Sequence, residues 1–513
     1  MNLLRNKTVA FSAFGLCATV VPAFAQQNAG EPKRPNIVFI MSDDHACQAI
    51  SAYGHGLNKT PNIDRIAKEG AIFTREFCTN SLCAPARAVI LTGKFSHMNG
   101  KIDNRTPFEG NQQTFPKLLR NAGYQTAIVG KWHLMNDPQG FDYWNIVPGQ
   151  GHYFNPDFIE MGEKKQVEGY ATSLITKYSL DWIEKRDRSK PFCIMIFHKA
   201  PHRNWLPEEK YQNLYRDKNF PLPDTFYDDY TGRGTAAHKQ EMQIVRDMRW
   251  GHDMKFEKDP YTGQQTDFKD ISRFTPEQLK TWRKNYNPQN EAFIRDRPEG
   301  RELAEWKYQR YMRDYMACIQ SVDDGVGEVL DYLNKNGLDK NTIVVYTSDQ
   351  GFYLGEHGWF DKRFMYQESF RTPLMMKYPK EIKPGRVIDK MVQNIDFAPT
   401  ILDYAGVSIP ADMQGESIRE VATGKNVKNW RDVVYYHYYE FPAEHAVRKH
   451  YGIQTDRYKL IHFYGDVDEW ELYDLKKDPE EMRSVYDDPE YKKVCEEMHV
   501  KLKEIRQKYK DED

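Results

Sequence analysis

A cysteine, a proline and an arginine stand at alternate positions in Cys83-Ala84-Pro85-Ala86-Arg87, just before an apolar run that predicts a helix. Proline is favoured in the first turn of a helix, where its missing N–H costs nothing, so we expect Cys83 near the helix N-terminus. The backbone N–H groups and the helix dipole there favour an anion, and Arg87 lies about one turn further along the same face. These residue types predict an anion-binding site with a nucleophilic thiol of lowered pKa. The alternative is a helix start that contains a cysteine without a function.

Two polar pairs elsewhere in the chain each follow a buried strand pattern. Asp43-Asp44 follows one such strand, and Asp349-Gln350 follows another. In open α/β sheets, ligands gather beyond the carboxyl ends of the strands. Three carboxylates and an amide oxygen repel one another there unless a cation lies between them, and oxygen ligands favour Ca²⁺ or Mg²⁺ over zinc. The alternative is that both pairs belong to ordinary loops or N-caps.

The elements that must position these residues alternate between strand and helix. Short apolar runs of the kind found in strands buried on both faces occur at residues 34–41, 125–130, 192–197, 342–348 and 373–378. Helical patterns occur at residues 61–69, 85–92, 114–122, 171–186 and 301–336. This alternation predicts an α/β sandwich in which helices cover a large, mostly parallel sheet.

The chain of 513 residues divides into segments of different composition. Residues 1–25 have the charged start, apolar middle and small-residue cleavage site of a secretory signal peptide. Residues 26–424 are predicted to form the main domain, with a surface insertion at about 206–300, where the apolar content is low. Residues 425–513 predict a smaller α+β subdomain with an antiparallel sheet, closed by a charged helix near 488–508.

Composition and charge exclude several classes of protein. A formal net charge of -2 argues against a nucleic-acid-binding protein. No segment after the signal peptide is apolar enough to span a bilayer, so we expect an exported protein, periplasmic or secreted, without a transmembrane segment in the mature chain. The scattered cysteines do not suggest a disulfide framework. Cys193 lies in a buried-strand pattern, and pairing of Cys47 with Cys78 stays open.

The Cys83-x-Pro85-x-Arg87 motif, followed by the sequence LTG, resembles the signature of type I sulfatases in the alkaline phosphatase superfamily. Further blocks that resemble the family occur in the family's order at residues 35–44, 123–134, 200–207, 348–363 and 396–406. The resemblance covers nearly the whole mature chain. It implies an alkaline-phosphatase-like fold and an enzyme that hydrolyses sulfuric esters.

The resemblance also assigns the metal site and the nucleophile. Four residues resemble the family's metal ligands, which most often bind Ca²⁺ rather than Mg²⁺: Asp43, Asp44, Asp349 and Gln350. Gln350 stands where many members have Asn or His, but it still offers an oxygen. Cys83 resembles the residue that a sulfatase-maturing enzyme oxidises to Cα-formylglycine, an aldehyde whose hydrate is the nucleophile.

Five further residues resemble the family's catalytic residues. Arg87 and Lys131 are expected to orient the hydrate. His202, assisted by Lys362, is expected to protonate the departing sugar oxygen. His133 is then expected to deprotonate the second hydroxyl of the hydrate, so that sulfate leaves and the aldehyde returns.

The substrate is expected to be a sulfated carbohydrate. Residues 198–208, 351–366 and 440–464 most resemble bacterial N-acetylglucosamine-6-sulfatases. This resemblance implies exo-acting removal of the 6-O-sulfate from N-acetylglucosamine of glycosaminoglycans or mucin-type glycans. Four residues are expected to contact the sugar: Asp361, Arg363, His445 and Arg448. The alternatives are an iduronate 2-sulfatase, an N-acetylgalactosamine sulfatase, a phosphonate or phosphate monoester hydrolase, and a non-catalytic glycan-binding protein.

Overall fold

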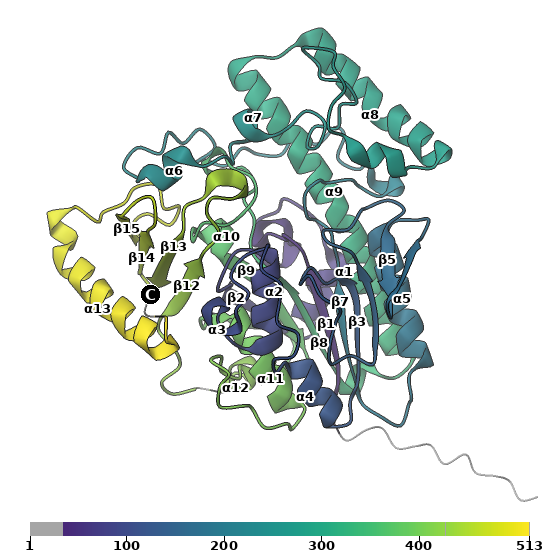
Figure 1. The fold of residues 1–513 in the computed structure, drawn as a ribbon, viewed down its shortest axis with the longest axis vertical. Helices are drawn as coiled ribbons and strands as arrows, with labels where there is room; N and C mark the ends of the chain where they lie inside the picture. The colour runs from purple at the N-terminus through teal and green to yellow at the C-terminus, as the bar shows by residue number, and fades with distance from the viewer. Residues whose placement is uncertain (1–33, 426, 512–513) are drawn as a thin grey trace, which may run out of the picture. The chain divides into compact units, whose positions relative to one another are not determined.

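A computed structural model describes residues 34–425 and 427–511 of the chain (Figure 1). Its larger sheet has 11 strands in the order β10-β2-β9-β8-β1-β7-β3-β4-β5-β6, with β11 beside β2. The central strand β1 (Asn36–Ser42) lies parallel to β7 (Phe192–Phe197) on one side and to β8 (Thr342–Ser348) on the other. The remaining strands are β2 (Ala71–Phe77), β3 (Gln125–Lys131), β4 (Tyr143–Val147), β5 (Asp157–Glu160), β6 (Glu163–Gln166), β9 (Arg371–Lys377), β10 (Arg386–Ile388) and β11 (Val392–Gln393).

Helices cover both faces of this sheet because the side chains of its buried strands alternate between two apolar cores. On β1, Val38 and Ile40 face one core, and Ile37, Phe39 and Met41 face the other. The first core packs against α1 (Pro61–Lys68), α5 (Ala171–Lys185) and α9 (Gly300–Lys335). The second packs against α2 (Cys83–Thr92), α4 (Phe115–Asn121) and α11 (Phe397–Tyr404). Burial of each such large apolar side chain contributes about 1.5–3 kcal/mol to stability.

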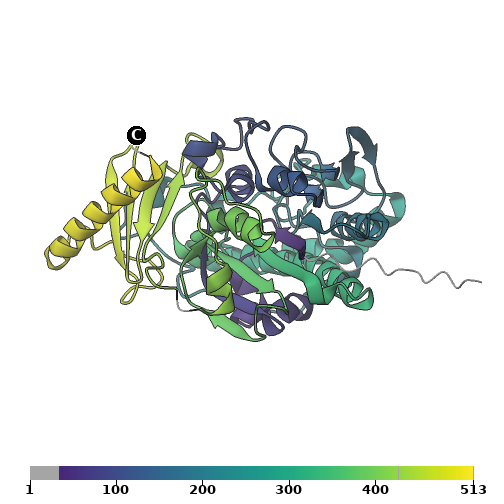
Figure 2. The same cartoon turned by 90° about the horizontal axis from the view of Figure 1, so that it is seen from below.

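A separate antiparallel sheet has the order β12-β13-β14-β15. Its strands are β12 (Val434–Tyr438), β13 (His450–Gln454), β14 (Tyr458–Phe463) and β15 (Glu469–Asp474). One face packs against α13 (Lys492–Tyr509), which runs along the sheet in Figure 2. The other face packs against aromatic residues that follow β8, including Trp359, Phe364 and Tyr366. The small sheet therefore supports the segment that carries Asp361, Lys362 and Arg363.

The segment at 206–300 is more ordered than its composition predicts. It contains α6 (Thr235–Lys239), α7 (Ile244–Asp247) and the long α8 (Pro276–Asp296). Helix α8 begins with a capping box between Thr275 and Gln278, and it buries Trp282, Tyr286 and Phe293 in the first core. Both signals are present in the sequence, but the many charged residues between the aromatic ones hide the pattern.

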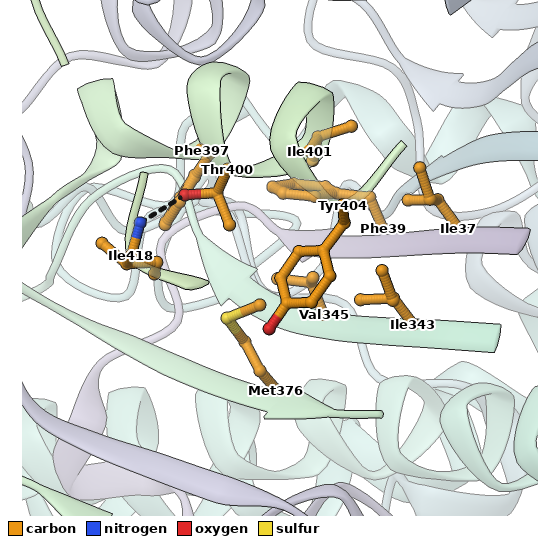
Figure 3. A pocket seen from close by; sticks show the side chains of 10 residues that line it. All are labelled: Ile37, Phe39, Ile343, Val345, Met376, Phe397, Thr400, Ile401, Tyr404 and Ile418. Carbon is orange, nitrogen blue, oxygen red and sulfur yellow. Dashed lines mark hydrogen bonds between the residues drawn. The ribbon is translucent and has the colours of Figure 1, made fainter. Parts of the chain in front are cut away.

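The cores are closely packed. A gap of about 10 Å³ lies in the second core, and Figure 3 shows that Ile37, Phe39 and Tyr404 are among the side chains around it. A gap of this size holds at most one water molecule, so we assign it no function. Among residues 34–425 and 427–511, no helix combines the length and the apolar character needed to cross a membrane.

The predicted fold class is confirmed: the large sheet is mostly parallel, and the small sheet is antiparallel. The predicted strands and helices occur within a few residues of their expected bounds, whereas β2 and the strands at the sheet edges were not predicted. The remaining helices are α3 (Ser96–Asn99), α10 (Gln367–Phe370) and α12 (Arg419–Thr423).

The predicted signal peptide lies outside the described residues, and the boundary near residue 425 stays a prediction. Cys47 and Cys78 are both free, and Cys193 is buried in β7.

Candidate active site

The pairing of β1 with β8 brings the two acidic pairs together. Ser42 and Ser348 are register partners at the carboxyl ends of these parallel strands, so the residues after them leave the sheet side by side. Carboxylate oxygens of Asp43, Asp44 and Asp349 lie within 4.8 Å of one another, and all three residues are buried. The N–H of Asp44 donates to Asp349 Oδ1 at 3.2 Å, which fixes one pair against the other.

Helix α2 places Cys83 and Arg87 at the same point. Cys83 is the first residue of the helix, only 1% of it is exposed, and its Sγ lies 3.4 Å from Asp43 Oδ1. Arg87, one turn later, lies 3.2 Å from Asp43 Oδ2 and 2.9 Å from Asp349 Oδ2, measured from Nη2. The expected position of Cys83 at a helix N-terminus is therefore confirmed, with Arg87 on the same side.

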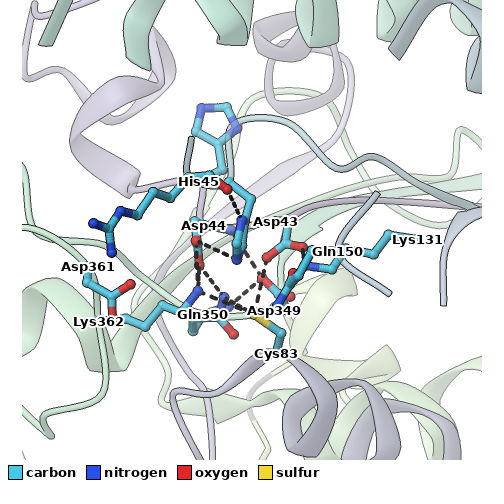
Figure 4. Close-up of polar contacts among 12 residues, drawn as sticks. Asp43, Asp44, His45, Cys83, Lys131, Gln150, Asp349, Gln350, Asp361 and Lys362 are labelled. Carbon is cyan, nitrogen blue, oxygen red and sulfur yellow. Dashed lines mark hydrogen bonds and ion pairs between the residues drawn. The ribbon is translucent and has the colours of Figure 1, made fainter. Parts of the chain in front are cut away.

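Two lysines complete the cluster (Figure 4). Lys131 ends β3, and its ammonium contacts the carboxylate of Asp43 and the amide oxygen of Gln150. Lys362 Nζ lies 2.5 and 2.7 Å from the two carboxylate oxygens of Asp44 and 3.3 Å from Cys83 Sγ. Lys362 therefore brings positive charge directly to residue 83, and Lys131 brings it to the neighbouring Asp43, which favours binding of an anion there.

The carboxylates of the cluster differ in how well their charge is balanced. Burial alone would raise the pKa of Asp43, but Lys131 and Arg87 hold it well below its usual value. Burial raises the pKa of Asp44 to about 6, although Lys362 opposes it. Burial and the charge of Asp43 raise the pKa of Asp349 to about 7. The protein's own cations therefore leave part of the negative charge without compensation.

The donors in this cluster fit a hard cation. Three carboxylates converge, and the Gln350 amide lies beside them, with Nε2 2.5 Å from Asp44 Oδ1 and 3.7 Å from Cys83 Sγ. The Oε1 atom of Gln350 is buried and has no hydrogen-bond partner among the described residues. Oxygen donors with excess negative charge suit Ca²⁺ or Mg²⁺ and do not suit a thiolate-bound metal.

The expected lowering of the Cys83 pKa is wrong. Burial and the charge of Asp43 raise the pKa of the thiol to about 12, against the opposing effects of Lys362 and Lys131. The helix N-terminus does not compensate for the lost hydration of a thiolate in a site that already holds three carboxylates. The local motif alone could not reveal this, because Asp43 comes from another strand.

The two predicted catalytic histidines lie at different distances from the cavity. His202 is close to the carboxylates, with Nε2 3.8 Å from Asp44 Oδ2, and one of its ring nitrogens lies within 4.8 Å of Cys83 Sγ and of an Asp43 oxygen. His133 follows β3, and its buried Nδ1 has no hydrogen-bond partner among the described residues. Burial and Lys131 lower the pKa of both rings, so both are neutral bases in the free protein.

A cavity of about 310 Å³ opens above this cluster. Cys83, His202 and Lys362 line it, together with three of the four predicted sugar contacts, Asp361, Arg363 and His445. Arg363 Nε donates to Asp361 Oδ2 at 2.9 Å, and His445 Nε2 lies 3.7 Å from the same oxygen. Arg448 is not among the lining residues: its guanidinium instead pairs with Asp466 at 3.1 Å.

Sequence reasoning missed more than half of the cavity wall. The additional lining residues are Asn104, Gln150, Gly151, His152, Lys199, Arg203, Arg249, His252, Asp270 and Glu444. Lys199 and Arg203 flank His202 in the sequence, and this adjacency was the one available signal. Several others come from the segment at 206–300, whose path over the sheet no local pattern predicts.

Several residues in and beside the cavity and the carboxylate cluster have a strained backbone, as do residues elsewhere in the described chain. Positive φ values occur at Asp44 (66°), His133 (58°), Asp361 (78°), Arg363 (97°) and His445 (67°). Such values are uncommon for residues other than glycine, and strained residues gather at functional sites, where the surrounding structure holds them.

Comparisons with known proteins agree with this geometry. Residues 35–407 match the Sulfatase family model, and residues 355–508 match the model for the C-terminal part of N-sulphoglucosamine sulphohydrolase. An N-acetylglucosamine-6-O-sulfatase of Bacteroides thetaiotaomicron is 49% identical over 506 residues, which cover 97% of this chain and 91% of the relative. The N-acetylglucosamine-6-sulfatase of Homo sapiens is 28% identical over 445 residues, which cover 80% of this chain and 68% of that protein.

Solved structures share the fold. One of them, a protein in complex with its substrate D-glucosamine-2-N,6-O-disulfate, has 49% sequence identity and a TM-score of 0.91, covering 94% of this chain and 99% of that chain. A phosphonate monoester hydrolase of Agrobacterium radiobacter has 19% identity and a TM-score of 0.71, covering 93% and 96% of the two chains. At that identity the second likeness concerns the fold alone.

Proposed function

The chain belongs to the sulfatase family and is a sulfuric ester hydrolase, and we propose that it removes the 6-O-sulfate from glucosamine residues of sulfated glycans. The observation that carries the proposal is the 49% identity, over nearly the full length, to an N-acetylglucosamine-6-O-sulfatase. The substrate-bound structure at the same identity contains a glucosamine with sulfate on both N2 and O6. We therefore infer that the substituent on N2 is either acetyl or sulfate.

The cavity supports action on a terminal sugar. Its volume of about 310 Å³ is at the lower end of the range for small-molecule pockets. The reacting residue Cys83 lies at its base, and Asp361, Arg363 and His445 form part of its wall, where they can bond sugar hydroxyls. A pocket of this size suits the end of a glycan rather than an internal residue.

We propose that Cys83 is converted to Cα-formylglycine by a maturing enzyme and that Asp43, Asp44, Asp349 and Gln350 hold Ca²⁺. The hydrated aldehyde supplies one hydroxyl that displaces the sugar oxygen from sulfur and a second whose deprotonation releases sulfate. A bound cation supplies positive charge that offsets the charge of the sulfate and of the attacking oxygen. Because only 1% of Cys83 is exposed, we infer that the conversion precedes the completion of folding.

The chain's own residues have these roles in the proposal. Arg87 and Lys131 hold the reacting residue at the N-terminus of α2, and the ammonium of Lys362 binds a sulfate oxygen. His202 carries a proton to the departing sugar oxygen, a step that negative charge from the bound sulfate favours by raising the basicity of the ring. His133, neutral in the free protein, accepts the proton whose removal lets sulfate leave.

The proposed location is outside the cytoplasm, either periplasmic or secreted. It is supported by the signal-peptide pattern of residues 1–25. Fractionation of the native host, with sequencing of the mature N-terminus, tests it.

The experiment that tests the proposed function is a sulfate-release screen on defined sugars. We expect turnover of N-acetylglucosamine 6-sulfate and no turnover of 2-sulfated uronic acids or of sulfated N-acetylgalactosamine. An aryl phosphate tests the phosphonate and phosphate hydrolase alternative. The Cys83→Ala variant should lose at least about 10³-fold in rate with an unchanged melting temperature. Release only from 2-sulfated uronic acids would overturn the substrate assignment.

A further inference from the structure

Lys199 is a buried cation that the reaction described above does not use. Only 3% of the residue is exposed, yet it lines the cavity. Its ammonium has no hydrogen bond or ion pair among the described residues, and it lies over the ring of Tyr153, with Nζ 4.7 Å from the ring centre. A buried charge without a partner is costly, so its position at the cavity indicates that it is balanced when the cavity is occupied.

The surroundings hold this lysine in one place. A Cβ atom at Gly151 would lie 3.5 Å from the Cδ atom of Lys199, so this glycine lies beside the lysine stem. Tyr153 is fully buried, and its hydroxyl donates to the carbonyl oxygen of His202 at 2.6 Å. The same tyrosine therefore links the support of Lys199 to the support of His202.

The charges around Lys199 are only partly the same as those around the reacting residue. The charges that act most strongly on Cys83 come from Asp43, Lys362, Lys131 and Asp349. Lys131 and Asp43 act on Lys199 as well, but so does Asp270, which does not act on Cys83 to a comparable extent. Asp270 is bonded in the cavity wall to Asn204 at 2.9 Å and to His152 at 3.2 Å. Burial and Lys131 lower the pKa of Lys199 to about 8, as a missing anion predicts.

We propose that Lys199 binds a second anionic group of the substrate, distinct from the sulfate that is cleaved. This inference rests on the proposed function. An N-acetyl group is neutral and leaves the ammonium without a partner, whereas a sulfamate on N2 or the carboxylate of an adjoining uronic acid balances it. Lys199 is thus a specificity-determining residue that favours substrates carrying a second negative charge.

The test compares Lys199→Met with the wild-type enzyme on three substrates: N-acetylglucosamine 6-sulfate, D-glucosamine 2-N,6-O-disulfate, and a uronate-containing disaccharide of N-acetylglucosamine 6-sulfate. We expect the preference for one of the doubly charged substrates over the first, expressed as a ratio of kcat/KM values, to fall about 10-fold or more. If the preference for the disulfate falls, Lys199 binds the sulfamate. If the preference for the disaccharide falls, Lys199 binds the carboxylate of the uronic acid. An equal loss on all three substrates, or no loss on any, overturns the proposal.

Arg249→Met is the matched control, since it removes a positive charge from the same cavity wall. Arg249 is exposed and paired with Asp267 at 2.9 Å, so its removal should change the preference far less. If both variants lose the preference for the doubly charged substrates equally, the preference comes from the overall positive charge of the cavity rather than from Lys199, and the proposal fails.

A binding measurement separates this proposal from the proposed function. In a Cys83→Ala background, calorimetry measures the affinity for each sugar with and without Lys199→Met. Absence of turnover of N-acetylglucosamine 6-sulfate by the wild-type enzyme would reject the proposed function. If Lys199→Met changes neither the affinity for the disulfated sugar nor the affinity for the disaccharide, the inference is rejected.

Discussion

The Nε2 atom of His202 lies 3.8 Å from Oδ2 of Asp44, at the base of the cavity that Cys83 lines. His202 can therefore reach the oxygen that leaves when a sulfate bound beside residue 83 is attacked. His133 cannot do the same, because it does not line the cavity.

This difference predicts a dependence on the leaving group. A sugar alkoxide needs a proton as it departs, whereas a nitrophenolate does not. We expect His202→Ala to lower kcat on a sugar sulfate by about 10²–10⁴-fold and to affect an aryl sulfate much less. His133→Ala is the contrast, since release of sulfate is common to both substrates and both should slow. Equal losses on the two substrates in His202→Ala would remove His202 from the role of acid.

A second prediction concerns the metal. Carboxylate oxygens of Asp43, Asp44 and Asp349 lie within 4.8 Å of one another, and their repulsion is relieved by a bound cation. Calcium at 100 times its dissociation constant should stabilise the fold by about 2.7 kcal/mol, which is visible as a higher melting temperature after addition of Ca²⁺ to chelator-treated protein. Gln350→Ala should require more calcium for the same rise. An unchanged melting temperature with full activity in chelator would contradict the site.

A third prediction separates the two residues that sequence reasoning grouped as sugar contacts. Asp361 lines the cavity, whereas Arg448 pairs with Asp466 outside it. Asp361→Ala should lower kcat/KM on a sugar sulfate by about 10–100-fold, with a smaller loss on an aryl sulfate that has no hydroxyls to bond. Arg448→Met should stay within about twofold of wild type. A large loss in Arg448→Met would show that the cavity closes differently around substrate.

A fourth prediction concerns acid stability. His450 is fully buried in β13: its Nδ1 donates to the carbonyl of Arg448 at 2.7 Å, and its Nε2 accepts the N–H of Met365 at 3.1 Å. Protonation removes this acceptor, and burial lowers the pKa of His450 to about 3. Histidine in an unfolded chain titrates near about 6.5. The stability that neutral His450 contributes is therefore fully present above that pH. It is lost as the pH falls toward 3, by about 1.4 kcal/mol per pH unit.

The measurement is the melting temperature at about pH 7 and about pH 5. We expect a decline in the wild type and a smaller decline in His450→Gln, whose amide retains a donor and an acceptor but does not titrate. Identical declines would assign the acid sensitivity to other buried groups, such as His198, whose pKa burial lowers to about 4.

Local sequence predicted much of the fold because buried strands and long helices leave patterns over a few residues. The runs that became β1, β7 and β8 are continuous and apolar, and α9 was predicted within one residue of its bounds, Gly300–Lys335. Short edge strands such as β10 (Arg386–Ile388) and β11 (Val392–Gln393) have no such pattern, because pairing rather than residue type defines them.

The sequence by itself determined the local placement of the residues in the cluster. Cys83 and Arg87 belong to one helical turn, and each acidic pair follows its own strand, so residue type and spacing were sufficient. Only the tertiary structure decided that Asp43 raises the pKa of the Cys83 thiol, that Arg448 lies outside the cavity, and that Lys199 lies inside it with no hydrogen bond or ion pair to its ammonium from residues 34–425 and 427–511. These properties depend on burial and on charges brought together from distant parts of the chain, and electrostatic interactions in a buried site follow distance in space rather than separation in sequence.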